Sequence, residues 1–448
     1  MDDIFIKIIP IIFILTLFTK IKTEISIPFY TKKLAPLKHE NMTTNLYGNN
    51  IYINLFVGTP SQKISFTLKF LEYTNFILSS EIIEDNNIEY NESLSSSFKK
   101  INDTRFYFYV DFFPFKEGIL INETISLKKK SKNLKEFKFI MATKLHRSGN
   151  YNIRNGGVIG LKIELKNFDE YENYNFFKNL YDKNLIKSES FMLVYDKNGE
   201  TGNFIIDPDE YNKYYYSKEF VYSRAHYFEE KLNWNLEASN IYYGNISINN
   251  NVNCRITNDF ASLISTDEYK KVIEENFFNI NVKNGNCNFF ILHDTFKIYY
   301  CYKYLNTSSI QPLKIEIKEM EYTFELKENE LWEYVGDYKY FLVIFREYYF
   351  FELEWTLSKP FLKKYPLIFD KSKKIIGFIK DRNVKKSLNI FDIKTIFIII
   401  LFIIVISLLW FISENYKNLV KRKKKRTIEL SEEAEYDYSP FGLIQVTK

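Results

Sequence analysis

Glycine, proline, cysteine and histidine are all scarce in this chain, and each shortage limits what the chain can be. Its 448 residues include 14 Gly, 10 Pro, 3 Cys and 4 His. The four histidines are scattered along the chain, so no metal site is predicted, and nothing in the sequence calls for a cofactor. Three cysteines permit one disulfide and leave one residue over.

The body of the chain also lacks an excess of positive charge. The formal net charge is +5, but residues 421–426 (KRKKKR) supply six positive charges, and without them the balance is about −1. A nucleic-acid partner therefore has no electrostatic support. The abundant residues are 42 Phe, 35 Tyr and many Ile, which favour strands. The length is enough for two domains of ordinary size, each with its own core.

The first apolar run is too short to cross a membrane. Residues 8–18 are apolar and are flanked by Lys7 and Lys20. A bilayer span needs about 20 residues, so this run fits a signal peptide over residues 1–23. An uncleaved amino-terminal anchor is the alternative, because residues 2 and 3 are acidic and no small-residue cleavage site is evident.

A second apolar run, near the other end, is long enough to span a bilayer. Residues 396–412 are almost unbroken Ile, Phe and Leu, which predicts a transmembrane helix over residues 395–413 after a linker at 383–394. The basic run that follows places the tail, residues 414–448, in the cytosol. We expect a single-pass type I membrane protein of the secretory pathway or cell surface, in contact with lipid through one helix.

Possible modification and sorting signals agree with this topology. Asn-x-Ser/Thr sequons, which mark glycosylation sites in a lumenal chain, all precede the predicted span. In the tail, Tyr438 and Phe441 form a Tyr-x-x-bulky pattern that predicts adaptor binding for endocytic sorting. A disordered acidic tail with an incidental Tyr is the alternative. The sequons are at Asn41, Asn91, Asn102, Asn122, Asn245 and Asn306.

Two segments of the body resemble the catalytic strand-loops of pepsin-like (A1) aspartic proteases. Residues 55–62 read LFVGTPSQ and precede an alternating strand at 63–68, and residues 255–265 read RITNDFASLIS. Four further segments resemble family motifs in the family's order. These are residues 156–161 (GGVIGL), 190–194 with 202–208, 234–237 (WNLE) and 355–378.

The resemblance implies an all-β, bilobal pepsin-like fold with few short helices. The two lobes are expected at residues 46–215 and 216–382, after a leader or propeptide-like segment at 24–45. One helix is expected over residues 267–277. The family's flap should lie near residues 106–120, where the flap tyrosine is replaced by Asp111, flanked by Tyr109 and Phe112.

Neither strand-loop carries the family's Asp-Thr-Gly. The first slot reads Lys69-Phe70-Leu71 and the second reads Asn258-Asp259-Phe260. The family chemistry needs two close carboxylates that share one proton. A lysine has no acceptor and an asparagine does not titrate, so Lys69 and Asn258, expected to face each other, cannot act as that pair.

The family's second lobe carries a disulfide, and Cys301 resembles one of its cysteines. The usual partner, near residues 335–345, is missing, and a bridge between Cys287 and Cys301 is the preferred alternative.

Three functions remain open. The first is an inactive homologue that binds a peptide or protein ligand in the interlobe cleft. The second is an active endopeptidase that uses the displaced carboxylates of Glu72 and Asp259. Asp259 is one residue past the slot, so without a bulge strand alternation would turn it away. The third is a surface or sorting receptor that uses the fold as a scaffold.

Overall fold

The computed structural model describes most of the chain between residues 24 and 436. It divides into a first unit, up to Lys380, and a second unit from Asp381 onward. The signal-peptide region, Asn41, Tyr109, Asp111, Phe112, Tyr438 and Phe441 lie outside the described residues. The described residues are 24–32, 37–39, 42–44, 46, 48–73, 75–80, 90–106, 115–127, 135–145, 156–163, 174–217, 219–228, 231–292, 294–347, 354–380 and 390–436.

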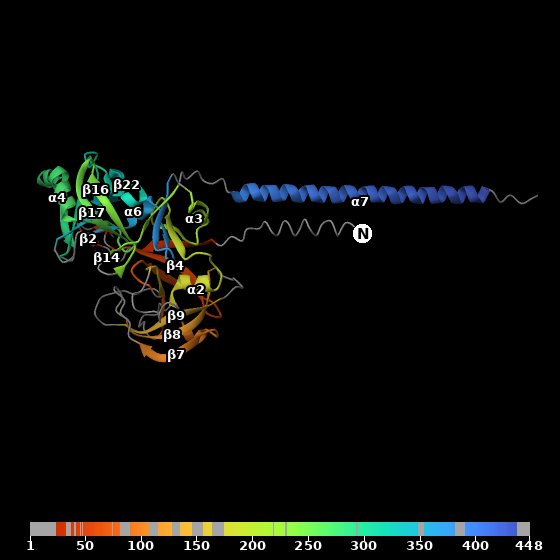
Figure 1. Cartoon of the computed structure of the whole chain (residues 1–448), viewed down its shortest axis with the longest axis horizontal. Helices are drawn as coiled ribbons and strands as arrows, with labels where there is room; N and C mark the ends of the chain where they lie inside the picture. Colours follow the sequence, from red (N-terminus) through yellow and green to blue (C-terminus); the bar gives the residue numbers. More distant parts are fainter. Residues whose placement is uncertain are drawn as a thin grey trace, which may run out of the picture. The chain divides into compact units, whose positions relative to one another are not determined.

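Strands dominate the described part of the first unit, which confirms the predicted mostly β fold class (Figure 1). The larger sheet has 13 strands within the described residues. In spatial order they are β13 (Phe220–Arg224), β28 (Ile375–Ile379), β27 (Ile368–Asp370), β11 (Ser190–Tyr195), β12 (Thr201–Ile206), β1 (Ile25–Lys32), β4 (Asn50–Val57), β5 (Gln62–Lys69), β10 (Gly157–Gly160), β6 (Phe76–Leu78), β9 (Lys135–Leu145), β8 (Phe115–Ser126) and β7 (Lys99–Phe106).

A second sheet of 11 described strands is built from the later half of the first unit. Its order is β22 (Tyr322–Leu326), β21 (Leu313–Ile317), β16 (Asn235–Tyr243), β17 (Ile246–Ile256), β26 (Glu354–Leu357), β18 (Leu263–Ser265), β25 (Val343–Arg346), β20 (Phe296–Tyr302), β24 (Tyr338–Phe341) and β23 (Trp332–Val335), with β19 (Cys287–Leu292) paired to β20. Two small hairpins complete the described strands: β2 (Leu37–His39) with β3 (Met42–Thr44), and β14 (Tyr227–Phe228) with β15 (Lys231–Leu232).

Helices in the first unit are short. The expected helix at 267–277 is present and begins with α4. Tyr269, Ile273 and Phe277 recur at every fourth position and are all buried, as expected for the inner face of a helix. Helical structure continues to residue 283. The described helices are α2 (Phe176–Asp182), α3 (Asp209–Tyr214), α4 (Asp267–Ile273), a π-helical turn η3 (Glu274–Phe278), α5 (Asn279–Lys283), α6 (Lys359–Lys364), and the 3₁₀ turns η1 (Glu92–Leu94), η4 (Lys318–Met320) and η5 (Glu328–Glu330).

The larger sheet draws strands from both sides of the lobe boundary expected at residue 215. β27 pairs with β11 and β13 pairs with β28, so strands beyond that boundary extend the sheet that starts in the first half. Aromatic rings fill the core under this junction: Phe369 lies 5.0 Å from Phe191 and 5.0 Å from Trp234 between ring centroids. The two halves therefore share one sheet and one core.

The leader or propeptide-like segment expected at residues 24–45 contains an integral strand. β1 pairs antiparallel with β12 on one side and β4 on the other. Its burial alternates, and Ile27 and Phe29 point into the core with 3% and 2% exposure. Removing residues 24–45 as a propeptide would therefore open the middle of the larger sheet.

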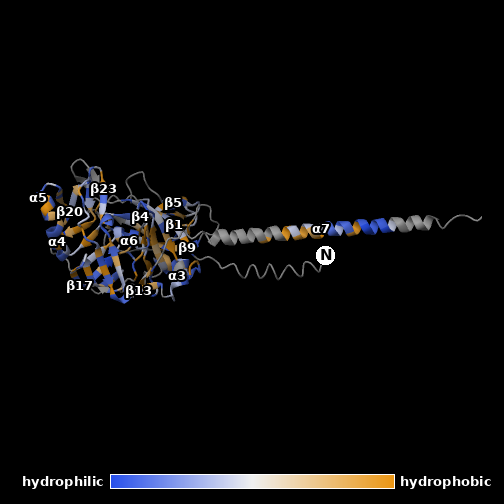
Figure 2. Ribbon diagram, turned by 90° about the horizontal axis from the view of Figure 1, so that it is seen from above, coloured by the Kyte–Doolittle hydropathy of each residue, from blue (hydrophilic) through white to orange (hydrophobic). Residues whose placement is uncertain are grey.

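The second unit contains one helix, α7 (Ile390–Tyr436). In its described part an apolar stretch precedes the basic run, seen as orange followed by blue along α7 in Figure 2. Among the described residues, however, no helix is both long enough and apolar enough to cross a membrane. The membrane span at 395–413 stays a prediction.

Candidate functional site

The first loop of the site is held by a hairpin and delivers Lys69. β4 and β5 pair along almost their full length, with Ile51 opposite Leu68, and every residue of β5 from Ile64 to Lys69 is buried. Gly58 in the connecting turn has φ +86°, and a Cβ there would lie 2.8 Å from the Ser95 hydroxyl, so the turn requires glycine. Lys69 is the last residue of β5 and is only 6% exposed.

The second loop joins two strands of the smaller sheet. β17 ends at Ile256 and β18 begins at Leu263, which leaves residues 257–262 outside any strand. The Ser262 hydroxyl donates to the Leu46 carbonyl at 2.7 Å, and the Ser358 hydroxyl donates to the Ser262 carbonyl at 2.6 Å. These bonds fix the loop against the segment that leads into β4 and against the start of α6.

The two loops meet through an ion pair. Lys69 Nζ lies 2.7 Å from Asp259 Oδ1, with the two side chains 7% and 13% exposed. Lys69 Nζ also donates to Asn50 Oδ1 at 2.8 Å. The other carboxylate oxygen of Asp259 accepts from the Thr257 hydroxyl at 2.7 Å. Both carboxylate oxygens are thus engaged by donors in a nearly dry environment.

Asn258 makes a different contact from the one expected. Its Nδ2 donates to the Leu68 carbonyl at 3.0 Å, and its own carbonyl accepts from Asn49 Nδ2 at 3.0 Å. The backbone N–H of Asn49 also donates to the backbone carbonyl of Asp259 at 2.8 Å. Asn49 and Asn258 are both fully buried. Side-chain amides therefore tie each loop to the backbone of the other.

Two expectations about these residues need correction. Lys69 was expected to meet Asn258, but its contacts are with Asp259 and Asn50. Asp259 was expected to point away from the first loop, and it points toward it. The reason is that strand alternation does not apply to Asp259, because it lies in the loop after β17 has ended.

Glu72, the other displaced candidate, lies beyond the end of β5 and is 7% exposed. Its backbone carbonyl accepts from the Lys162 amide at 2.8 Å, and a Cβ on Gly160 would lie 2.7 Å from that carbonyl oxygen. Among the described residues, Asp259 hydrogen-bonds with Lys69 and Thr257, not with Glu72. The structure thus brings Lys69 and Asp259 together and gives Glu72 a role in backbone packing.

The slots of the missing Thr and Gly are also occupied by packing residues. Phe70 is 1% exposed, and its ring lies 5.1 Å from Phe369 and 5.8 Å from Phe191. Phe260 packs against the smaller core cluster around Leu46 and Tyr340. Phe70 and Phe260 thus contribute to the packing on either side of the Lys69–Asp259 contact.

Asn49, Asn50 and Thr257 are site residues that sequence reasoning did not single out. Asn50 lies 19 residues before Lys69 and reaches it only because β4 and β5 are antiparallel. The one signal was local: two adjacent Asn residues stand immediately before an apolar strand, where buried amides need partners.

The remaining predicted sites are distributed over the surface and the second half. Asn91 and Asn122 are half-buried, Asn245 and Asn306 are exposed, and Asn102 lies in β7. Cys287 and Cys301 form a disulfide across the β19–β20 pair. The third cysteine, Cys254, is free and buried.

Comparison with known proteins agrees with this arrangement. The family model for eukaryotic aspartyl protease matches residues 51–380, which is most of the chain. No curated protein matches the chain in sequence. The family match covers both loops and the strands that hold them. The chain therefore belongs to the eukaryotic aspartyl protease family.

Proposed function

We propose that this protein is a catalytically inactive aspartyl protease homologue that binds an extended peptide or protein segment in the interlobe cleft. The observation that carries the proposal is the ion pair between Lys69 and Asp259. The family reaction needs two carboxylates that share a proton and act on water. An ammonium group opposite a single carboxylate offers no such pair.

Ligand binding is the use of the fold that survives this change. An extended peptide can bind by adding a strand, because main-chain hydrogen bonds supply affinity and pockets for alternate side chains supply specificity. Neither needs a catalytic group. The buried ion pair and the hydrogen bonds donated by the side-chain amides of Asn49 and Asn258 also hold the two loops in one arrangement. A preformed binding surface requires such a fixed arrangement.

We further propose that the first unit is lumenal or extracellular and that residues 395–413 anchor it as a single-pass type I protein. Supporting this are the apolar stretch before the basic run and the exposure of Asn245 and Asn306. A surface or sorting receptor is the related alternative, with Tyr438 and Phe441 in the tail as the adaptor signal.

The decisive experiment measures peptide hydrolysis by the full-length protein, purified in detergent, between pH 3 and pH 7. The proposal expects no acid-dependent cleavage and only weak binding of a pepstatin-like transition-state mimic, because no carboxylate pair is present to grip it. A pool of labelled extended peptides, read by fluorescence anisotropy, tests ligand binding on the same sample.

Two sets of variants separate this proposal from an active enzyme with displaced carboxylates. Cleavage that disappears in Glu72→Gln or Asp259→Asn would show that those groups act, and would overturn the inactive assignment. Replacing Lys69 and Asn258 together by Asp is expected to leave the protein inactive. Leu71 and Phe260 would still occupy the two glycine positions of the family loops.

A further inference from the structure

Two of the predicted glycosylation sequons share the same spacing to a tyrosine. Tyr243 precedes Asn245 by two residues, and Tyr304 precedes Asn306 by two residues, so both segments read Tyr-x-Asn-x-Ser. The two Asn side chains are both exposed. Neither the shared sequence pattern nor the exposure of the two Asn side chains distinguishes the two sites.

The structure separates them through the tyrosines. Tyr243 is 2% exposed, and its ring packs edge-on against Tyr269 at 6.1 Å, inside the main core. Tyr304 is 79% exposed. One face of its ring stacks on Tyr302 at 5.4 Å between centroids with 10° between the planes, which leaves the opposite face to solvent.

The exposed Tyr304 ring is supported from behind by two further rings, and Asn306, two residues along the chain, is exposed as well. Tyr302 stacks in turn on Tyr338 at 5.2 Å, so three rings form one continuous ladder. Leu305, between Tyr304 and Asn306, packs against the main core. Leu305 is directed toward the core, whereas both of its neighbours, Tyr304 and Asn306, are exposed to solvent.

The amide of Asn306 is also held in a defined position. Its Oδ1 accepts from the Ser308 amide at 2.9 Å. This bond uses the oxygen and leaves Nδ2, the atom that carries an N-linked glycan, on the other side of the group. In glycosylation the sugar C1 moves from a lipid pyrophosphate carrier to Nδ2. The C1–N bond forms, the C1–O bond to the pyrophosphate breaks, and Nδ2 gives up a proton.

We propose that Tyr304, backed by Tyr302 and Tyr338, forms a stacking platform for the first sugar of an N-linked glycan on Asn306. A pyranose ring has a face of C–H groups that is largely apolar, and covering an exposed aromatic face with it removes apolar surface from water. Asn245 has no such platform, because its tyrosine faces the core. This inference rests on the lumenal orientation proposed above.

The test is a cycle of variants of the full-length protein made in a glycosylating eukaryotic cell, with its glycans trimmed to one N-acetylglucosamine per site. We expect Asn306→Gln to lower the Tm by about 2 °C when Tyr304 is present, and by much less in the Tyr304→Ala background. Tyr304→Phe should retain the full effect, because it keeps the ring. Asn245→Gln is the matched control and should show no dependence on Tyr304.

The outcomes distinguish this inference from the orientation on which it rests. Mass spectrometry gives the occupancy of each sequon. If every sequon is empty, the lumenal orientation is wrong, and the platform falls with it. If other sequons are occupied and Asn306 is not, the platform alone is wrong. The platform is also wrong if Asn306 carries a glycan but Tyr304→Ala changes the Tm equally in the protein with that glycan and in the protein without it.

Discussion

Lys69 Nζ lies 2.7 Å from Asp259 Oδ1, and this contact joins the two loops that resemble the catalytic strand-loops of aspartic proteases. It is a pair of opposite charges, whereas the family reaction uses two carboxyl groups that share a proton. The pair is nearly dry and both partners have further hydrogen bonds, so it holds the two loops together.

Breaking this ion pair on one side is expected to destabilise the protein strongly. Lys69→Met leaves the Asp259 carboxylate buried without its cation, and Asp259→Leu leaves the Lys69 ammonium buried without its anion. Each is expected to lower the free energy of unfolding of the first unit by about 3–5 kcal/mol, measured by denaturant titration. The double variant should lose less than the sum of the two, because neither charge is then stranded.

The matched control for the ion pair is Lys99 with Glu136. These side chains lie 3.0 Å apart but are 63% and 52% exposed. Lys99→Met is expected to change the free energy of unfolding by less than about 1 kcal/mol. Equal effects for the two lysines would show that burial does not set the strength of the Lys69 pair.

Sequence reasoning identified the loops but not their contact, and the difference has a physical cause. The turn at Gly58 and the strand after it are local features, which the residue types of the turn and the alternating sequence of the strand predict. The helix from Asp267 is likewise a local feature, because its buried residues recur at helical spacing. The contact of Asp259 with Lys69 joins residues 190 positions apart through a loop with no repeating geometry.

The shared sheet was missed for a related reason. The pairing of β27 with β11 and of β1 with β12 depends on which strand edges meet in space, and no local pattern encodes that choice. The alternation of β1 was readable as a strand, since Ile27 and Phe29 point one way and Ser26 and Tyr30 the other. Its position in the middle of the sheet was not readable.

The position of β1 predicts that residues 24–32 remain in the mature protein. Phe29 is 2% exposed, its ring lies 5.1 Å from that of Tyr195, and a Cβ on Gly202 would lie 2.5 Å from it. Phe29→Ala is expected to lower the free energy of unfolding by about 3–5 kcal/mol, whereas the exposed Ser26→Ala should have little effect. Amino-terminal sequencing of the purified protein checks retention. A mature protein that begins near residue 46 and melts normally would contradict the prediction.

The disulfide and the free cysteine should respond differently to thiol chemistry. Cys287 and Cys301 are 14 residues apart, and closing a loop of this size stabilises a fold by about 3 kcal/mol. Cys287→Ser with Cys301→Ser is expected to lose about that amount in denaturant titration. Burial raises the pKa of the Cys254 thiol well above its ordinary value, so the native protein should resist alkylation at pH 8 and react only after unfolding. Rapid labelling of Cys254 in the native state would contradict its buried position.

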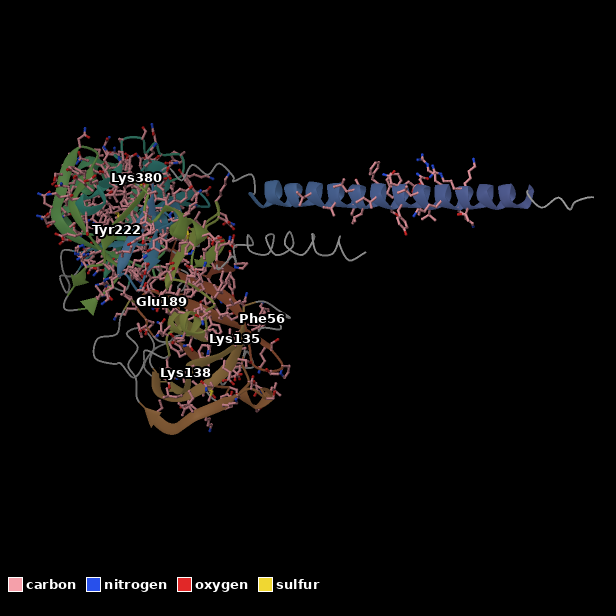
Figure 3. All side chains as sticks on the ribbon, turned by 45° about the vertical axis from the view of Figure 1, so that its right-hand side comes forward. Phe56, Lys135, Lys138, Glu189, Tyr222 and Lys380 are labelled. Atoms are coloured by element: carbon pink, nitrogen blue, oxygen red, sulfur yellow. A yellow bond between two sulfur atoms is a disulfide. The ribbon has the colours of Figure 1, made fainter. Side chains whose placement is uncertain are left out.

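Lys371 predicts an unusual dependence of stability on pH. Its side chain is 5% exposed, and among the described residues its Nζ has no hydrogen-bond partner. Nζ lies 4.9 Å from the Tyr73 ring centroid and 5.2 Å from that of Phe177. Burial lowers the pKa of Lys371 to about 7, although the charge of Glu189 opposes the shift. Burial also raises the pKa of Glu189, whose side chain is labelled in Figure 3.

The direction of the pH effect follows from the lowered pKa of Lys371. An unfolded lysine titrates near pH 10.4, so between about pH 7 and 10 the unfolded chain binds more protons than the folded protein. The contribution of Lys371 to stability therefore rises with pH over that window, by about 3–5 kcal/mol for a fully buried group. Lys371→Met should flatten the rise, whereas the exposed Lys135→Met should leave it unchanged. The check is thermal or denaturant unfolding at a series of pH values. A pH dependence between pH 7 and 10 that Lys371→Met does not alter would show that Lys371 is not buried as a weakly solvated amine.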